Sequence, residues 1–173
     1  KVQTKKVAVI GGGPSGLSCA YQMARRGYPV TVFEAADKPG GMLRYGIPSY
    51  RLPEEVLDAE IQNILDLGVE LKCGVKIGED ISFTQLNSDY DVVYVAVGAQ
   101  KGSSMKIEGE DNARVLSGVD FLRRINSCET VDVGGKVVVV GGGNTAVDAA
   151  RVSKSLGADV PITSSSAMRN QPR

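Results

Sequence analysis

Ten residues near the N-terminus decide the fold: Val7-Ala8-Val9-Ile10-Gly11-Gly12-Gly13-Pro14-Ser15-Gly16. An unbroken apolar run that ends in glycine is typical of a strand buried on both faces of a parallel sheet. Apolar side chains then recur at helical spacing until Gly27 ends the run. We therefore predict a strand over residues 7–10, a tight glycine turn, and a helix over residues 14–26.

The glycine turn has the G-x-G-x-x-G pattern of a dinucleotide-binding loop. The first glycine makes the tight turn, the second lets the backbone approach a pyrophosphate, and the third lets helix and strand pack closely. A proline in the first helical turn costs no hydrogen bond. The N–H groups of the helix start, which carry about half a positive charge, then face the phosphates. The residues assigned to the pyrophosphate are Gly11, Gly12, Gly13, Pro14, Ser15 and Gly16.

An acidic residue completes this first site. Glu34 ends a second apolar strand, predicted over residues 30–33, where a carboxylate can accept a hydrogen bond from a ribose hydroxyl. The alternative is a strand–helix turn that binds nothing, with Glu34 as a solvated surface acid. Strand, glycine pattern and acid together favour the dinucleotide. Because Glu34 would repel a 2′-phosphate, the site suits FAD or NAD rather than NADP.

Composition excludes several classes of function. The chain has 173 residues, 20 Lys plus Arg, 20 Asp plus Glu and no histidine. Without histidine, neither a Ser-His-Asp system nor an imidazole metal ligand is available. Zero net charge argues against nucleic acid or an anionic membrane surface as the partner. The three cysteines form no C-x-x-C pair, so we expect no metal site and a reducing, cytoplasmic location. We also expect no signal peptide and no membrane-spanning segment.

A second strand–glycine–helix unit follows the first. We predict a loop over 35–52, helices over 53–67 and 119–125, and strands over 69–73 and 91–97. A strand over 136–140 then leads into Gly141-Gly142-Gly143-Asn144-Thr145-Ala146 and a helix over 144–156. The G-x-G-x-x-A form, with alanine in the last slot, is compatible with a dinucleotide, often NADP.

The second unit is expected to be incomplete. Its next strand should begin near residue 158, but a central parallel strand cannot accommodate Pro161, which lacks an N–H. Two interpretations of this unit are equally supported: a dinucleotide-binding site, or a phosphate loop whose surrounding site is incomplete. We expect an α/β, Rossmann-like, three-layer FAD/NAD(P)-binding fold in which residues 1–118 bind FAD, residues 119–160 begin an NAD(P)H-binding domain, and residues 161–173 form an unplaced tail.

The sequence resembles the small (beta) subunit of NADPH-dependent glutamate synthase and the homologous flavin module of dihydropyrimidine dehydrogenase. The two glycine loops carry part of this resemblance. The narrower part is the block Gly40-Gly41-Met42-Leu43-Arg44-Tyr45-Gly46-Ile47-Pro48, followed by Arg51-Leu52-Pro53. Members of this family carry a cysteine-rich region before the first loop and continue beyond the second helix, so we expect this chain to be a fragment.

The resemblance implies roles for further residues. Gly41, Met42 and Arg51 would lie along the flavin, and Ile77 would give a backbone contact near the adenine. Val97 and Gly98 end a strand that passes close to the flavin. The NADPH phosphates would be held by Gly142, Gly143, Asn144, Thr145 and Ala146.

The resemblance also implies a function. The chain would be an FAD-dependent NAD(P)H oxidoreductase module that passes electrons from NADPH, or NADH, through FAD to an iron–sulfur protein or a larger synthase subunit. No protein acid or base is assigned, because hydride transfer between the cofactors needs none. The alternative is a non-catalytic dinucleotide-binding fragment with incomplete FAD and NADPH sites.

Overall fold

The computed structural model describes residues 3–163, and the chain divides into two compact units. The first unit comprises the chain up to Arg44 together with Ser49–Gln100, and the second comprises Tyr45–Pro48 and the chain from Lys101 onward. The division after residue 100 precedes the sequence-based boundary after residue 118. The loop between these two boundaries folds back on itself: Gly102 lies so close to Ser117 that a side chain at Gly102 would collide with it. The loop therefore belongs to the second unit.

The first unit is a parallel four-stranded sheet. Its strands are β1 (Val7–Ile10), β2 (Val30–Phe33), β3 (Glu70–Lys72) and β4 (Val92–Val95), in the order β3-β2-β1-β4. The helices are α1 (Pro14–Arg25), the short α2 (Met42–Tyr45), α3 (Glu54–Leu65) and α4 (Phe83–Asp89). The predicted strands over residues 7–10 and 30–33 are confirmed, and all eight of their residues are buried.

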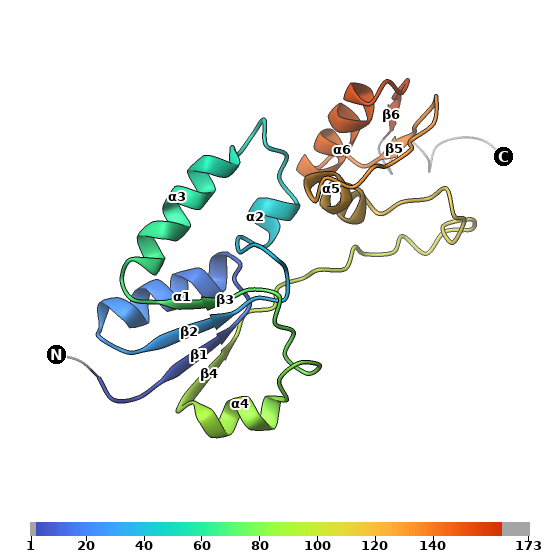
Figure 1. Cartoon of the computed structure of the whole chain (residues 1–173). Helices are drawn as coiled ribbons and strands as arrows, with labels where there is room; N and C mark the ends of the chain where they lie inside the picture. Colours follow the sequence, from blue (N-terminus) through green and yellow to red (C-terminus); the bar gives the residue numbers. More distant parts are fainter. Residues whose placement is uncertain (1–2, 164–173) are drawn as a thin grey trace. The chain divides into compact units, whose positions relative to one another are not determined.

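Helices cover both faces of this sheet, which gives three layers (Figure 1). Alternate strand residues point to opposite faces. Val9 and Val32 pack with Ala20 of α1, whereas Ile10 and Phe33 pack with Leu86 of α4. Because both faces of β1 and β2 are covered, these strands are apolar except for Thr31, whose hydroxyl is paired with Glu70. The three-layer Rossmann-like prediction is therefore confirmed.

β3 and β4 form the edges of the sheet. β4 pairs with β1 alone, and its outer side carries no strand among the described residues. The apolar side chains of Val92, Val95 and Val97 are about half exposed on this edge. Both edge strands are shorter than the ranges predicted from the sequence, 69–73 and 91–97.

Two helices of the first unit were not predicted. α2 lies inside the predicted loop over residues 35–52, and α4 lies in a stretch with no predicted element. α4 begins at an N-cap, where the Ser82 hydroxyl accepts a hydrogen bond from the Gln85 N–H at 3.1 Å. A seven-residue helix shows too few apolar positions for its period to be recognised, so the serine cap is its main sequence signal.

The second unit contains α5 (Gly118–Asn126), β5 (Val139–Val140), α6 (Asn144–Ser155) and β6 (Ile162–Thr163). Phe121 and Leu122 of α5 pack against Ala149 and Val152 of α6, and together they form its core. The predicted helices over 119–125 and 144–156 are confirmed. Within this unit the Asn126 side-chain amide donates a hydrogen bond to the backbone carbonyl of Tyr45 at 3.1 Å.

The expectation that Pro161 prevents a parallel strand is wrong. β6 directly follows Pro161 and pairs in parallel with β5, and Val139 N–H donates to the Pro161 carbonyl at 3.1 Å. Asp159 N–H donates to Gly135 one step earlier in the ladder, but at the next step Pro161 has no N–H to donate. The pairing is consequently divided into an isolated Lys136–Asp159 bridge and the two-residue strands. Residues 164–173, the rest of the predicted tail, lie outside the described residues.

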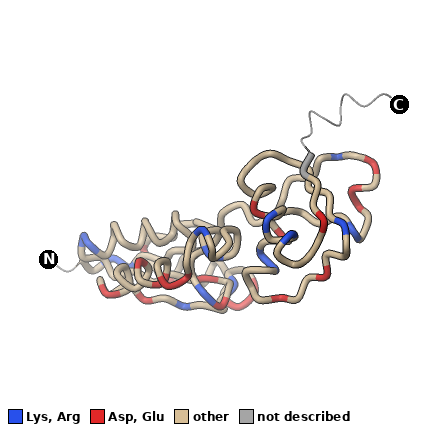
Figure 2. The backbone as a smooth tube through the Cα atoms, turned by 90° about the horizontal axis from the view of Figure 1, so that it is seen from above, with Lys and Arg blue, Asp and Glu red and all other residues tan. Residues whose placement is uncertain are grey.

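Acidic and basic residues are interspersed along the backbone of each unit (Figure 2). None of the helices within residues 3–163 has the length and apolarity needed to cross a membrane.

Candidate functional site

The first glycine loop lies at the carboxyl edge of the sheet, directly after β1. Gly11 has a φ of +109°, and a side chain there would collide with the Ala96 carbonyl. A side chain at Gly16 would collide with the carbonyl of Gly11. These two glycines therefore let strand, turn and helix approach one another at distances that no other residue allows.

The middle of the loop leaves room for a ligand. A Cβ added to Gly13 would meet nothing closer than the Cα of Gly41, at 3.7 Å. Gly13 is also the N-cap of α1, so no side chain caps the amide groups at the helix start. Uncapped N–H groups beside open space are what a pyrophosphate requires. On this observation the loop fits the diphosphate of a dinucleotide.

The Ser15 hydroxyl takes part in a contact within the sheet unit. Its Oγ lies 3.0 Å from the Tyr94 hydroxyl on β4, and the two groups share a hydrogen bond. The contribution of Ser15 to a phosphate is then expected from its backbone N–H.

Glu34 joins the end of β2 to the glycine loop. Its Oε2 accepts from the Gly12 N–H at 2.7 Å, and its Oε1 accepts from the Ala36 N–H at 2.8 Å. Each carboxylate oxygen has a second lone pair and can also accept from a ribose hydroxyl. The acid predicted to bind ribose therefore also fixes the loop that is predicted to bind the pyrophosphate.

A second turn, residues 39–41, packs against the glycine loop. Gly40 N–H donates to the Gly12 carbonyl at 2.8 Å. Gly41 has a φ of +53°, and a Cβ there would lie 2.8 Å from the Cα of Gly13. The predicted flavin-side residue Gly41 thus lies directly beside the phosphate loop, and Met42 follows it as the first residue of α2. No individual role was predicted for Gly40, whose φ of +125° marks the turn.

The other predicted residues of the first site are placed less directly. The ladder continues past β4, with Ala96 N–H donating to Ile10 O, so Val97 and Gly98 follow at the same carboxyl edge. Ile77 packs on the cluster around Phe33 and bridges to Ile81. Arg51 lies in the turn before α3 and is exposed. These assignments remain predictions, as do those of the second loop.

A thiol near Glu34 was not predicted as part of the site. Cys73 follows β3, and its neighbour Gly74 donates a backbone hydrogen bond to the Ala36 carbonyl. Burial raises the pKa of the Cys73 thiol; the carboxylates of Glu34 and Asp37 raise it further, and the Arg44 guanidinium lowers it. Burial and the two carboxylates therefore oppose deprotonation of this thiol.

The second glycine loop connects β5 to α6. Gly141 has a φ of +142°, and a Cβ there would lie 3.0 Å from the Cβ of Ala146. An added Cβ at Gly142 or Gly143 would meet open space, and Gly143 caps α6 without a side chain. This loop also fits a phosphate group. The last position of its G-x-G-x-x-A pattern is Ala146, whereas the equivalent position of the first loop, Gly16, has no room for a side chain.

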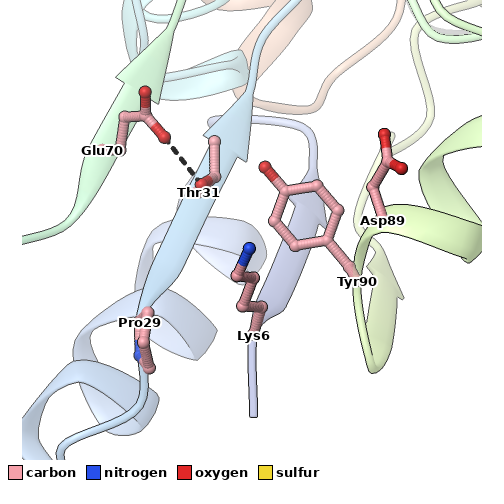
Figure 3. A pocket seen from close by; sticks show the side chains of 6 residues that line it. All are labelled: Lys6, Pro29, Thr31, Glu70, Asp89 and Tyr90. Carbon is pink, nitrogen blue, oxygen red and sulfur yellow. Dashed lines mark hydrogen bonds between the residues drawn. The ribbon is translucent and has the colours of Figure 1, made fainter. Parts of the chain in front are cut away.

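A hollow of about 480 Å³ lies where the strands of the first sheet begin, at the end opposite to the glycine loop (Figure 3). It is lined by Lys6, Pro29, Thr31, Glu70, Asp89 and Tyr90. Most of these residues precede or begin their strands, so the hollow lies at the amino edge, opposite to the glycine loop. Dinucleotides bind at the carboxyl edge of such sheets, so we do not assign this hollow to them.

The described part of the chain holds neither a metal-binding cluster nor a disulfide. It contains no group of three or more Cys, Asp or Glu residues placed to hold a metal ion. Cys19, Cys73 and Cys128 are all free thiols.

Comparisons with known proteins agree with this geometry. A family described as "Pyridine nucleotide-disulphide oxidoreductase" matches residues 5–168. The chain is 50% identical over 157 residues to the NADP(+)-dependent formate dehydrogenase subunit beta of Moorella thermoacetica, which covers 89% of this chain and 22% of that protein. It is 40% identical over 153 residues to the NAD-dependent dihydropyrimidine dehydrogenase subunit PreT of Salmonella typhimurium, which covers 88% of this chain and 37% of that protein. Among solved structures, FprA of Mycobacterium tuberculosis in complex with NADPH matches with a TM-score of 0.78 and 26% identity, over 87% of this chain and 36% of FprA.

Proposed function

The chain belongs to the pyridine nucleotide-disulphide oxidoreductase family, and on that premise we propose that it is the cofactor-binding part of an enzyme that passes electrons from NADPH through FAD to an iron–sulfur partner. The family match and the NADPH-bound neighbour indicate FAD and NADPH as the cofactors. The chain spans 22% and 37% of the two relatives described above, so the activity belongs to a longer protein.

One observation carries the proposal: the carboxylate of Glu34 bridges the amides of Gly12 and Ala36 beside the uncapped start of α1. Amide groups at the helix start bind the pyrophosphate of FAD, and the carboxylate orients its ribose. The second loop supplies a similar set of amides for NADPH. When bound, the two cofactors supply hydride transfer, which needs no protein acid or base and so agrees with the lack of histidine.

The partner and the specific family member are finer parts of the proposal. Two relatives are named as subunits, which supports a partner protein as electron acceptor. A glutamate synthase-like identity is supported by the block around Tyr45–Pro48 in the sequence. Three free cysteines support a reducing, cytoplasmic location.

The test combines flavin uptake with a variant of the second loop. Purified full-length protein, reconstituted with FAD and kept anaerobic, should lose its flavin absorption band when NADPH is added and should then reduce a dye. Gly143→Val should abolish reduction by NADPH without loss of FAD or thermal stability, because its side chain would enter only the open space of the loop. Gly135→Val, another glycine with open space, is the matched control and should remain active. Protein that takes up no flavin and reduces no dye would refute the proposal.

A second candidate is a nucleotide-binding module without turnover. It is favoured by the two-stranded sheet of the second unit and by the chain's short span of its relatives. The same experiment separates the two, because this candidate predicts flavin uptake without reduction by NADPH.

A further inference from the structure

One buried cation lies behind the predicted flavin side of the site. Arg44 is 6% exposed, and no other lysine or arginine in the described chain is buried. Burial of a guanidinium is costly unless every charge and donor is paired. Arg44 sits in α2, and its guanidinium is enclosed by the turn that precedes α2 and by the start of α3.

The guanidinium joins this turn to α3 through three contacts. Its Nε donates to the Pro39 carbonyl at 2.6 Å. Its Nη1 donates to Glu54 Oε2 at 3.2 Å, and its Nη2 donates to Asp58 Oδ1. Glu54 and Asp58 are four residues apart and so occupy one face of α3. The planar fork of arginine can serve a carbonyl and two carboxylates at once, which a lysine ammonium cannot do with the same geometry.

The turn held in this way is the one that supports the phosphate loop. Gly40 N–H donates to the Gly12 carbonyl, and Gly41 lies against Gly13. A Cβ added to Gly40 would approach both Arg44 Cβ and Leu57 at 3.0 Å, so the turn is also closely packed on its inner side. Contacts therefore run without a gap from α3 through Arg44 and the turn to the glycine loop.

We propose that Arg44, with Glu54 and Asp58, is a positioning residue for FAD: it holds the Pro39–Gly41 turn, which fixes the Gly12 carbonyl, so that Gly13 and the start of α1 present their amides to the pyrophosphate. Arg44 touches no cofactor in this role and acts through the turn. The proposal rests on the proposed function, because it takes FAD as the ligand of this loop.

The direct test is the dissociation constant for FAD of the flavin-free full-length protein, measured by quenching of flavin fluorescence. Arg44→Met should raise this constant about tenfold or more, because the turn loses its three anchors. Arg44→Lys should restore little of the affinity, because the charge returns without the fork. Arg26→Met is the matched control: Arg26 is exposed at the other end of α1, and its guanidinium donates to the backbone and side-chain oxygens of Gln22, so FAD affinity should not change.

A double-mutant cycle and amide exchange distinguish positioning from a general loss of stability. Arg44→Met and Asp58→Asn should be non-additive in FAD affinity, because they remove the same contact. In flavin-free protein, Arg44→Met should speed hydrogen exchange at the Gly40 amide more than at amides of β2. A merely structural role would lower the melting temperature while exchange rose to the same degree at both places.

Each outcome decides the proposal. Folded Arg44→Met protein with wild-type FAD affinity and wild-type exchange at Gly40 would overturn it. If Arg44→Met does not fold, Glu54→Gln and Asp58→Asn decide instead: their side chains are about half exposed, and unchanged FAD affinity in both would overturn the proposal. If the wild-type protein binds no FAD, the proposed function fails, and exchange at Gly40 alone tests whether Arg44 holds the turn.

Discussion

The carboxylate of Glu34 accepts a hydrogen bond from the backbone N–H of Gly12 at 2.7 Å, so the end of β2 and the turn after β1 are fixed to each other. Its second oxygen is also engaged, by the N–H of Ala36. Both partners are donors, and this requirement distinguishes a carboxylate from an amide at this position.

Glu34→Gln is therefore expected to weaken FAD binding about tenfold. Glutamine offers one acceptor and one donor, so its NH₂ group must face one of the two backbone N–H groups. Fluorescence titration of the full-length protein with FAD measures the effect. Glu60→Gln, an exposed position on α3, is the control and should leave affinity unchanged. Equal affinity in Glu34→Gln and wild-type protein would remove Glu34 from the site.

Substitution of the last residue of each glycine loop should change the free energy of unfolding by different amounts. Gly16→Ala should destabilise the protein by about 3 kcal/mol, because the new Cβ collides with the Gly11 carbonyl. Ala146→Gly should cost no more than about 1 kcal/mol, through loss of helix propensity. Urea denaturation of both variants measures the difference. Similar losses in the two variants would show that helix and strand can separate at Gly16.

Ser82→Ala should destabilise α4 by about 1 kcal/mol, because the Gln85 N–H loses its cap. Ser82→Asp should keep the cap and most of the stability. The free energy of unfolding from denaturant titration gives the comparison. A full loss in Ser82→Asp would mean that the hydroxyl has another role.

Thr31→Val should change how stability depends on pH. The Thr31 hydroxyl donates to Glu70 Oε2 at 2.8 Å, and this bond is the main cause that lowers the pKa of the Glu70 carboxyl; burial opposes it, and Lys72 adds to it. A carboxyl with a lowered folded-state pKa stabilises the fold above its unfolded-state pKa, and this stability is lost as pH falls through the folded-state value.

The stability difference between wild type and Thr31→Val should accordingly be largest at neutral pH and should shrink as pH falls below the usual range of glutamate. The effect is small, because solvent screens the exposed carboxylate. Thr31→Ser keeps the hydroxyl and should follow the wild type. Melting temperatures across this pH range give the result, and a difference independent of pH would contradict it.

The sequence predicts the strand, glycine turn and helix start of the first unit because their requirements are local. A buried strand, a tight turn and a helix start each impose residue types within residues 7–16, and Glu34 follows the next strand. The second loop is recognisable for the same reason. Such features can be read from neighbouring residues without knowledge of the rest of the fold.

Other features depend on contacts between distant segments. Nothing local to Arg44 shows that it is buried, because its partners Glu54 and Asp58 come from another helix. The strand after Pro161 was excluded on a rule for central strands. The structure accommodates the proline by omitting one hydrogen bond, which a short two-stranded pairing tolerates.

The outer side of β4 has a practical consequence for handling the protein. Within residues 3–163 no strand pairs with this side of β4, and a free strand edge with half-exposed valines is a template on which further strands can add. Preparations of this polypeptide by itself are therefore expected to scatter light increasingly with concentration and time. Light scattering should accordingly be recorded during every FAD titration, so that a signal change caused by aggregation is not attributed to ligand binding.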